Sequence, residues 1–149
     1  MKPDVDIVMQ GFLGTLLMDI APHLNAEYSV GNVSIMGLML FMASEEYDRA
    51  ADIRVAENNE MRALFAHAAG IVEDAALKAK LAAAAATTDG SLRVRTLNEG
   101  NAALAGLLIE LQEHAETSKA AWAAGLEARI WDWLVASTER RKLPLPSFG

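Results

Sequence analysis

The feature that most constrains the fold of this chain is the stretch from residue 34 to residue 68, which lacks Pro and has a single Gly, Gly37. Pro breaks a helix because it has no backbone N–H and clashes with the preceding turn, and Gly costs about 1 kcal/mol relative to Ala. Apolar residues recur along the stretch at spacings of three and four, which is typical of one helix face. This stripe contains Val33, Met36, Leu40, Ala43, Tyr47, Ala51, Val55, Asn58, Met61 and Phe65. We therefore expect one long central helix.

The remainder of the chain also predicts helices, because it is rich in Ala and Leu and lacks alternating β-branched runs. We expect helices over residues 3–21, 34–68 and 73–86, a fourth that begins near residue 91 and includes residues 98–115, and a fifth from residue 118 onward. A connection is expected over residues 25–34 and a turn over residues 87–90. The last two helices are alternatively one, since nothing at Thr117 and Ser118 forces a break. The sequence thus predicts an all-α, single-domain bundle of four to five helices over residues 1–143. Pro144 and Pro146 predict an extended tail over residues 144–149.

A short helical pattern occurs twice. Asn58 is followed by large apolar residues three, six and seven positions later, and Asn101 is followed in the same way. This spacing places each Asn on the apolar face of its helix. An amide buried there costs about 1–3 kcal/mol unless it finds hydrogen-bond partners. We therefore expect two core helices to meet through a polar contact between the two copies.

The repeated pattern Asn-x-x-Met/Leu-x-x-Leu-Phe/Leu, whose second copy continues as Ile109-Glu110-Leu111, resembles small uncharacterised all-helical proteins of bacteria. The resemblance covers residues 46–116. The two copies differ where Ala105 stands in the place of Arg62. The resemblance implies a helical fold and transfers no activity.

Composition and charge exclude several classes of function. The chain has no Cys, so disulfides and Cys-ligated metals are excluded. Its formal net charge of −7 disfavours binding to nucleic acid, and its densest basic cluster, residues 140–142, suits a helix C-terminus. The longest clean apolar run, residues 35–43, is about half of the ~20 residues that span a bilayer, so we expect a buried helix and no membrane segment. Asp4 and Asp6 disfavour a signal peptide, which leaves a cytoplasmic location.

Two groups of residues are candidate metal ligands. Glu45, Asp48 and Asp52 share a helix face and could bind a cation, although a solvated polar face is the simpler explanation. Glu110 and His114 are four residues apart and could share a metal or form a surface pair. No His follows a Glu at the spacing that a di-iron bundle needs, and no nucleophile motif occurs, so we name no catalytic residue and expect no cofactor.

Four residues are candidate ligand anchors. Arg54 lies on the otherwise apolar stripe, where an Arg must reach solvent or meet an acceptor. Arg54, Asn58 and Asn101 could therefore line an apolar pocket in the bundle, and Tyr47 lies on the same stripe.

These features favour a non-catalytic helical protein that acts as a homodimer or through a protein partner, using Trp131 or the Met-rich part of the long helix. One alternative is a small-molecule binder anchored by Arg54, Asn58 and Asn101. The other is an enzyme or metal protein that uses Glu45, Asp48 and Asp52.

Overall fold

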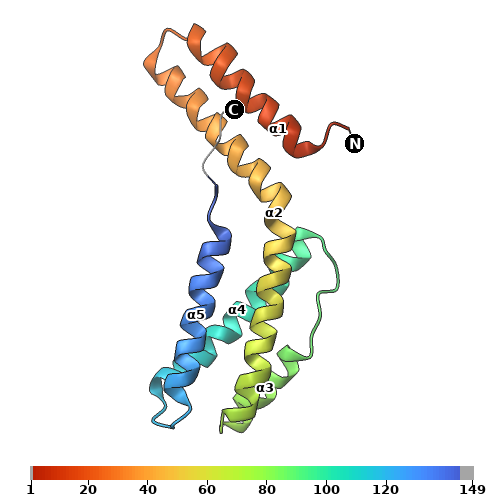
Figure 1. Ribbon diagram of the computed structural model, residues 1–149, viewed down its shortest axis with the longest axis vertical. Helices are drawn as coiled ribbons and strands as arrows, with labels where there is room; N and C mark the ends of the chain where they lie inside the picture. Colours follow the sequence, from red (N-terminus) through yellow and green to blue (C-terminus); the bar gives the residue numbers. More distant parts are fainter. Residues whose placement is uncertain (1, 145–149) are drawn as a thin grey trace. The chain divides into compact units, whose positions relative to one another are not determined.

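The computed structural model describes residues 2–144, and all regular secondary structure within them is helical (Figure 1). The elements are α1 (Val5–Gly14), a π-helical segment η1 (Thr15–Ile20), a 3-10 turn η2 (Ala21–His23), α2 (Glu27–Ile71), α3 (Ala75–Ala85), α4 (Val94–Thr117) and α5 (Ala123–Arg141). The predicted all-α fold with five helices, one of them long, is confirmed.

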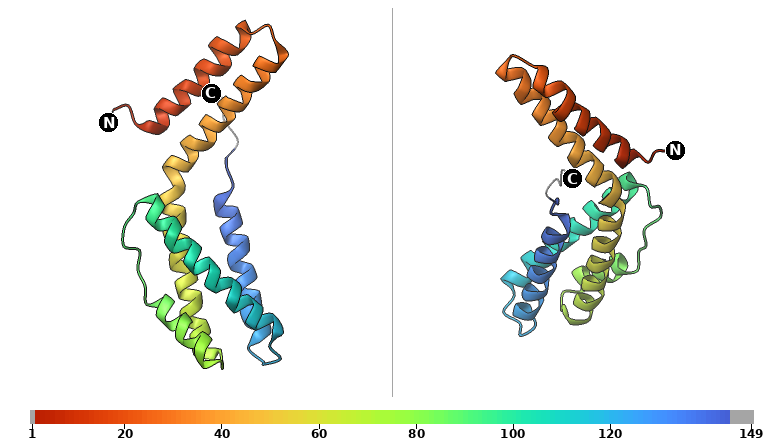
Figure 2. Two further views of the ribbon diagram at one scale, coloured as in Figure 1. Left: turned by 180° about the vertical axis from the view of Figure 1, so that it is seen from behind. Right: turned by 45° about the horizontal axis from the view of Figure 1, so that its top comes forward.

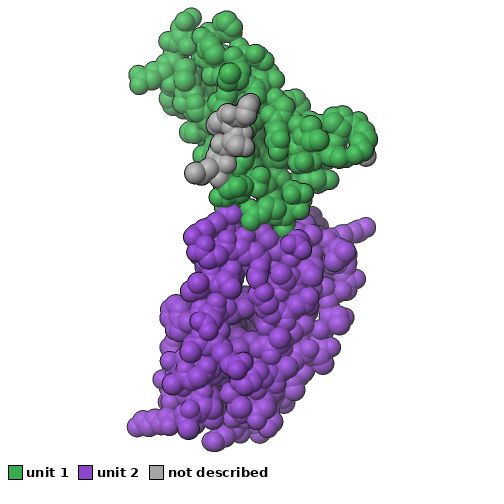
Figure 3. Space-filling view, viewed as in Figure 1, with its two compact units in different colours: residues 1–50, 143–149 green, residues 51–142 purple. Residues whose placement is uncertain are grey.

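The chain packs into two compact units (Figure 3). Unit 1 comprises residues 1–50 and 143–149, of which residues 2–50 and 143–144 are described, and unit 2 comprises residues 51–142. The helix α2 contributes to both units. A single domain over residues 1–143 stays a prediction, and the predicted tail lies, beyond Pro144, outside the described residues.

Unit 1 is a helical hairpin in which α1, η1 and η2 run beside the first part of α2 (Figures 1 and 2). The side chain of Ser44 ties the two arms together, because its Oγ donates to the backbone oxygen of Asp6 over 3.2 Å. Gly37 lies where the arms cross: a Cβ atom there would stand 3.0 Å from Leu13 Cδ1 and 3.4 Å from Leu17 Cδ2. The absence of a side chain at Gly37 therefore sets how closely the arms approach.

The predicted connection over residues 25–34 is wrong, because α2 begins at Glu27. Ser34 does not cap a helix there; its Oγ donates to the carbonyl of Val30 over 2.9 Å, inside the helix. Gly31 and Asn32 are weak helix formers, but the helix continues through them. Packing against the other arm of the hairpin outweighs their low intrinsic propensity.

The prediction that residues 35–43 lie in a buried helix is also wrong. The side chains of Ile35, Met36, Leu38 and Met39 are 53–64% exposed. This part of α2 packs against a single arm, and one neighbouring helix covers only one face.

We expected no segment long and apolar enough to span a bilayer. By length and composition alone, one segment meets that criterion, so this expectation is wrong. The segment Val5–His23 has a mean hydropathy of 1.3, and 6% of it is buried. The helical path continues through Asp19 and Pro22 as π and 3-10 turns. These two residues are too few to lower the mean hydropathy of the segment by much.

Unit 2 contains the apolar core. The second half of α2 lies with α3, α4 and α5 around it (Figures 1 and 2). Its buried residues are Met61, Phe65, Ala68, Val72, Leu77, Leu81, Leu104, Leu108, Leu111, Ala115, Leu126 and Ile130. Trp122 and Trp133 pack against this core, whereas Trp131 is 58% exposed.

Local signals fix the ends of the helices in unit 2. The carboxylate of Asp74 caps α3, because its Oδ1 accepts from the backbone N of Leu77 over 2.7 Å. Residues 87–90, where we expect a turn, lie in a longer irregular connection between Ala85 and Val94. Ser118 is the extended C-cap of α4, and its Oγ accepts from the backbone N of Ala120 over 3.2 Å. The fourth and fifth helices are therefore separate.

Replacing Gly37 by Val is expected to destabilise the hairpin. Two methyl groups would enter a crossing where one Cβ already reaches 3.0 Å, and such overpacking costs about 1–3 kcal/mol. Amide hydrogen exchange of α1 measures the effect, with faster exchange expected in the variant. Gly31→Val is the control, because Gly31 lies on the same helix with nothing within 4 Å. Equal exchange in the two variants would contradict the tight crossing.

Candidate functional site

The most unusual feature of unit 2 is a polar network buried beside the apolar core. We define the polar network as Glu57, Asn58, Arg62, Asp89, Asn101, Ser137 and Arg141, of which the Arg141 side chain is 45% exposed. These side chains come from α2, the connection between α3 and α4, α4 and α5. Glu57 and Asn58 are fully buried, and Arg62 is 8% exposed. A buried charge is expensive unless it is paired and hydrogen-bonded, so the partners of each group decide its role.

Glu57 makes the densest set of contacts. Its Oε1 accepts from Ser137 Oγ over 2.7 Å and from Arg141 Nε over 2.6 Å. Its Oε2 accepts from Arg141 Nη2 and from Asn101 Nδ2, the latter over 3.2 Å. Both carboxylate oxygens are thus bound twice, which compensates the loss of water.

Asn58 and Asn101 touch, as their repeated pattern predicts. Asn101 Nδ2 donates to Asn58 Oδ1 over 3.0 Å, which confirms that the two copies meet through a polar contact. Asn58 Nδ2 in turn donates to Asp89 Oδ1 over 3.0 Å. Asn58 therefore connects α4 with the connection that follows α3.

Arg62 and Asp89 form the second charged pair of the network. Arg62 Nη2 donates to Asp89 Oδ1 over 2.6 Å, and both side chains are nearly buried, at 10% and 12% exposure. Arg62 Nε also donates to Thr87 Oγ1 over 3.1 Å, and its Nη1 donates to Asn59 Oδ1 over 3.2 Å. Arg62 thereby holds the residues after α3 against α2.

The surroundings lower the pKa of both carboxyl groups. Burial by itself would raise the pKa of Glu57, but the hydrogen bonds from Arg141 and Ser137 oppose it. With the charge of Arg141 and the hydrogen bond from Asn101, they hold this pKa below its ordinary value of 4.5. The hydrogen bond from Arg62 lowers the pKa of Asp89 below 3.8, against the effect of burial, and Asn58 adds to it. Both groups are therefore carboxylates at neutral pH.

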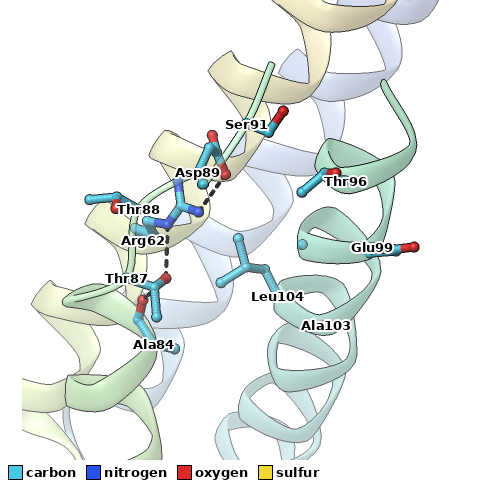
Figure 4. Close-up of a pocket in the computed structure, with 12 residues that line it drawn as sticks. Arg62, Ala84, Thr87, Thr88, Asp89, Ser91, Thr96, Glu99, Ala103 and Leu104 are labelled. Atoms are coloured by element: carbon cyan, nitrogen blue, oxygen red, sulfur yellow. Dashed lines mark hydrogen bonds and ion pairs between the residues drawn. The ribbon is translucent and has the colours of Figure 1, made fainter. Parts of the chain in front are cut away.

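A pocket of about 400 Å³ adjoins the network (Figure 4). Its lining comes from α2, the end of α3, the connection after it and α4. The residues are Arg62, Ala84, Thr87, Thr88, Asp89, Gly90, Ser91, Thr96, Glu99, Gly100, Ala103 and Leu104. The pair of Arg62 and Asp89 forms one wall.

The four predicted ligand anchors do not line this pocket. Asn58 and Asn101 use their amides within the network. Arg54 Nε donates to Asn98 Oδ1 over 2.8 Å, and Tyr47 is 59% exposed on unit 1. The structure therefore joins Asn58 to Asn101, and a ligand-binding role for the four residues stays a prediction.

Two of the predicted metal ligands, Glu45 and Glu110, pair with basic side chains. Glu45 pairs with Arg49 over 3.6 Å, and Asp48 and Asp52 are exposed. Glu110 accepts from Lys80 Nζ over 2.6 Å, and His114 stacks on Trp122 with ring centroids 5.8 Å apart. Within residues 2–144 no group of three or more His, Asp or Glu side chains is placed to hold a metal ion. The metal hypothesis gains no support from this arrangement.

Sequence reasoning missed Glu57, Arg62, Asp89, Ser137 and Arg141. A signal for Arg62 was available, because it follows Asn58 by four residues and so shares its helix face. Arg141 lies in the basic cluster that suits a helix C-terminus, and α5 does end there, yet its side chain binds Glu57. Nothing in the sequence marks Ser137, whose partner lies 80 positions away.

The network is suited to structure rather than catalysis. A general base needs a carboxylate that is able to accept a proton from a substrate. The carboxylate of Glu57 is instead fully buried, bound by four donors and held at a low pKa. It therefore fixes the positions of α2, α4 and α5 in unit 2.

Glu57→Gln is expected to lower the free energy of unfolding of unit 2 by about 1.5–3 kcal/mol. Each group that faces the carboxylate donates a hydrogen bond to it. The NH₂ group of Gln is itself a donor, so it would face another donor and hydrogen bonds would be lost. Urea unfolding followed by circular dichroism measures the change. Glu60→Gln, three residues along α2, is the control, because Glu60 is 40% exposed and its pair with Arg140 is worth less than about 1 kcal/mol. An equal loss in both variants would contradict a special role for Glu57.

Stability is expected to fall in acid. The folded pKa values of Glu57 and Asp89 lie below the ordinary values of 4.5 and 3.8, so the unfolded chain binds more protons in that range. The contribution of the two groups is therefore complete above about pH 5 and is lost as the pH falls through the folded pKa values. Urea titrations from neutral pH to pH 3 measure this loss, which is expected to be shallower in Glu57→Gln. If stability falls equally with pH in the parent and in Glu57→Gln, Glu57 does not contribute to the loss in acid.

Comparisons with models of protein families, with curated proteins and with solved structures found no match for this chain. The resemblance of the repeated Asn pattern to small bacterial helical proteins stays a prediction. A functional proposal therefore rests on the geometry and chemistry of the two units themselves.

Proposed function

We propose that this protein is a non-catalytic, self-associating helical module, and that the hairpin over residues 5–44 binds the same hairpin of a second copy. One observation carries the proposal: the hairpin leaves ten of its large apolar side chains exposed. Those side chains are Ile7, Phe12, Met18, Ile20, Tyr28, Ile35, Met36, Leu38, Met39 and Met42.

The two units differ in how many of their large apolar side chains are buried. Among the described residues of unit 1, Leu13 is the only large apolar side chain that is buried. Unit 2 buries a contiguous apolar cluster and exposes few large apolar side chains for its greater length. Burial of one large apolar side chain contributes about 1.5–3 kcal/mol, so covering several from each hairpin would drive association.

A second hairpin is a suitable cover. Two helices side by side bury only the stripes that face each other, whereas four helices enclose a core. Charged residues are absent between Glu27 and Glu45, and also between Asp6 and Asp19, so the middle of both arms can pass into an interface. The exposed Met side chains favour this further, because Met adapts its shape to a partner.

Charge favours a second copy over a lipid surface. Residues 2–50 contain seven carboxylates and two basic side chains, Lys2 and Arg49, whereas membrane-bound segments are flanked by Lys and Arg. The negative surface of a membrane would repel such a segment. Gln10, Thr15 and Asn32 are exposed within the apolar surface, and polar groups of this kind are better tolerated between proteins than in hydrocarbon.

Sedimentation velocity of the full chain, without detergent, tests the proposal. We expect a species of twice the 16.0 kDa chain mass, and Met39→Glu is expected to raise its dissociation constant at least about tenfold, or 1.4 kcal/mol. Met39 is 64% exposed, so the substitution should leave the fold of the monomer intact while placing a charge in the interface.

Trp131→Glu is the matched control, because Trp131 is 58% exposed but lies on α5 in unit 2. Its dimer is expected to resemble the parent. Equal dissociation of the two variants would contradict an interface on the hairpin. A monomer that partitions into phosphatidylcholine vesicles would instead assign the apolar surface to lipid and overturn self-association.

A further inference from the structure

The pocket beside Arg62 and Asp89 has a chemistry that self-association does not use. It lies wholly within unit 2, so it is independent of the hairpin. We propose that this pocket binds a neutral, polyhydroxylated small molecule of about the size of a monosaccharide. Binding of such a ligand is a second activity, beyond the proposed function.

The polar wall of the pocket is held in place before any ligand arrives. Asp89 Oδ1 accepts from Arg62 and from Asn58, and Arg62 is bound further by Thr87 and Asn59. Binding groups that are already ordered do not lose conformational entropy when a ligand binds. The connection after α3, which supplies residues 87–91 of the lining, is thereby tied to α2.

This wall keeps hydrogen-bonding capacity for a ligand. Within the described residues, Asp89 Oδ2 makes no hydrogen bond, and three of the five N–H groups of Arg62 are used. The hydroxyls of Thr88 and Thr96 also have no partner among those residues. An acceptor, a donor and two groups that do both thus line one pocket.

The charges of the wall select a neutral ligand. Arg62 Nη2 and Asp89 Oδ1 lie 2.6 Å apart. An anion that is attracted by the guanidinium is therefore repelled by the carboxylate, and a cation that is attracted by the carboxylate is repelled by the guanidinium. In Figure 4 the side chain of Glu99 points away from this pair. A hydroxyl group can both donate to Asp89 and accept from Arg62, which makes an array of hydroxyls complementary to the wall.

The α4 side of the pocket, which carries Thr96, is aliphatic in part. Figure 4 shows Leu104 extending from α4 toward Arg62, with Ala103 beside it on the same helix. The carbon–hydrogen face of a sugar ring is apolar and can pack against such a surface while its hydroxyls face the charged pair. A volume of about 400 Å³ admits a ring of this size with its first water molecules.

An NMR titration of ¹⁵N-labelled full-length protein tests the inference, with D-glucose, D-ribose and glycerol as neutral probes and sodium phosphate and ethanolamine as charged ones. Saturable shifts of the backbone amides of Thr88, Gly90 and Gly100 are expected with at least one sugar, at a Kd of about 1 mM. Thr96→Val keeps the shape of an exposed side chain but removes its hydroxyl, and is expected to weaken binding about threefold to tenfold.

Thr138→Val on α5, outside this pocket, is the control and is expected to bind the sugar as the parent does. No saturable shift with any neutral probe up to about 100 mM, a hundred times the expected Kd, would overturn the proposal. Saturation by phosphate or ethanolamine without sugar binding would overturn the ligand class. Equal affinity of Thr96→Val and the parent would overturn the placement.

Discussion

The interaction on which unit 2 depends is the compensation of one buried charge. Glu57 is enclosed by α2, α4 and α5, and a bare carboxylate there would favour the unfolded chain by several kcal/mol. Ser137, Asn101 and Arg141 remove that penalty by binding both oxygens. Because these donors lie on two different helices, the charge is satisfied only when both helices are in place. A buried ion of this kind adds little net stability, but it disfavours any packing that separates its partners.

The same network organises the pocket. Asn58 touches Asn101 on one side and Asp89 on the other, so the amides that join α2 to α4 also position the carboxylate in the pocket wall. Gly100 precedes Asn101, and a Cβ atom there would stand 3.7 Å from the amide of Asn58 and 3.9 Å from Asp89. This is ordinary contact, so α4 packs closely on the network without strain. In Asp89 these structural hydrogen bonds use Oδ1, which leaves Oδ2 for the ligand that we propose.

Unit 1, in contrast to unit 2, has no large apolar core among its described residues. It has little interior, and its arms meet across Gly37 and the bond from Ser44 to the backbone of Asp6. The apolar surface left over is consistent with a hairpin that is completed by a partner. The residues that we propose for self-association and those that we propose for ligand binding belong to different units.

The sequence by itself determined the helices and one contact. Periodicity and the absence of Pro predict α2, because these signals act within a few residues. The meeting of Asn58 and Asn101 was predictable, since an amide on an apolar face needs a partner and a second copy offered one. The tertiary structure alone decided the rest. Ser137 and Arg141 bind Glu57 across 80 and 84 positions, and no local pattern encodes such a partner. The burial of residues 35–43 could not be predicted either. An apolar run has the same sequence pattern whether several helices surround it or a single helix packs on one face.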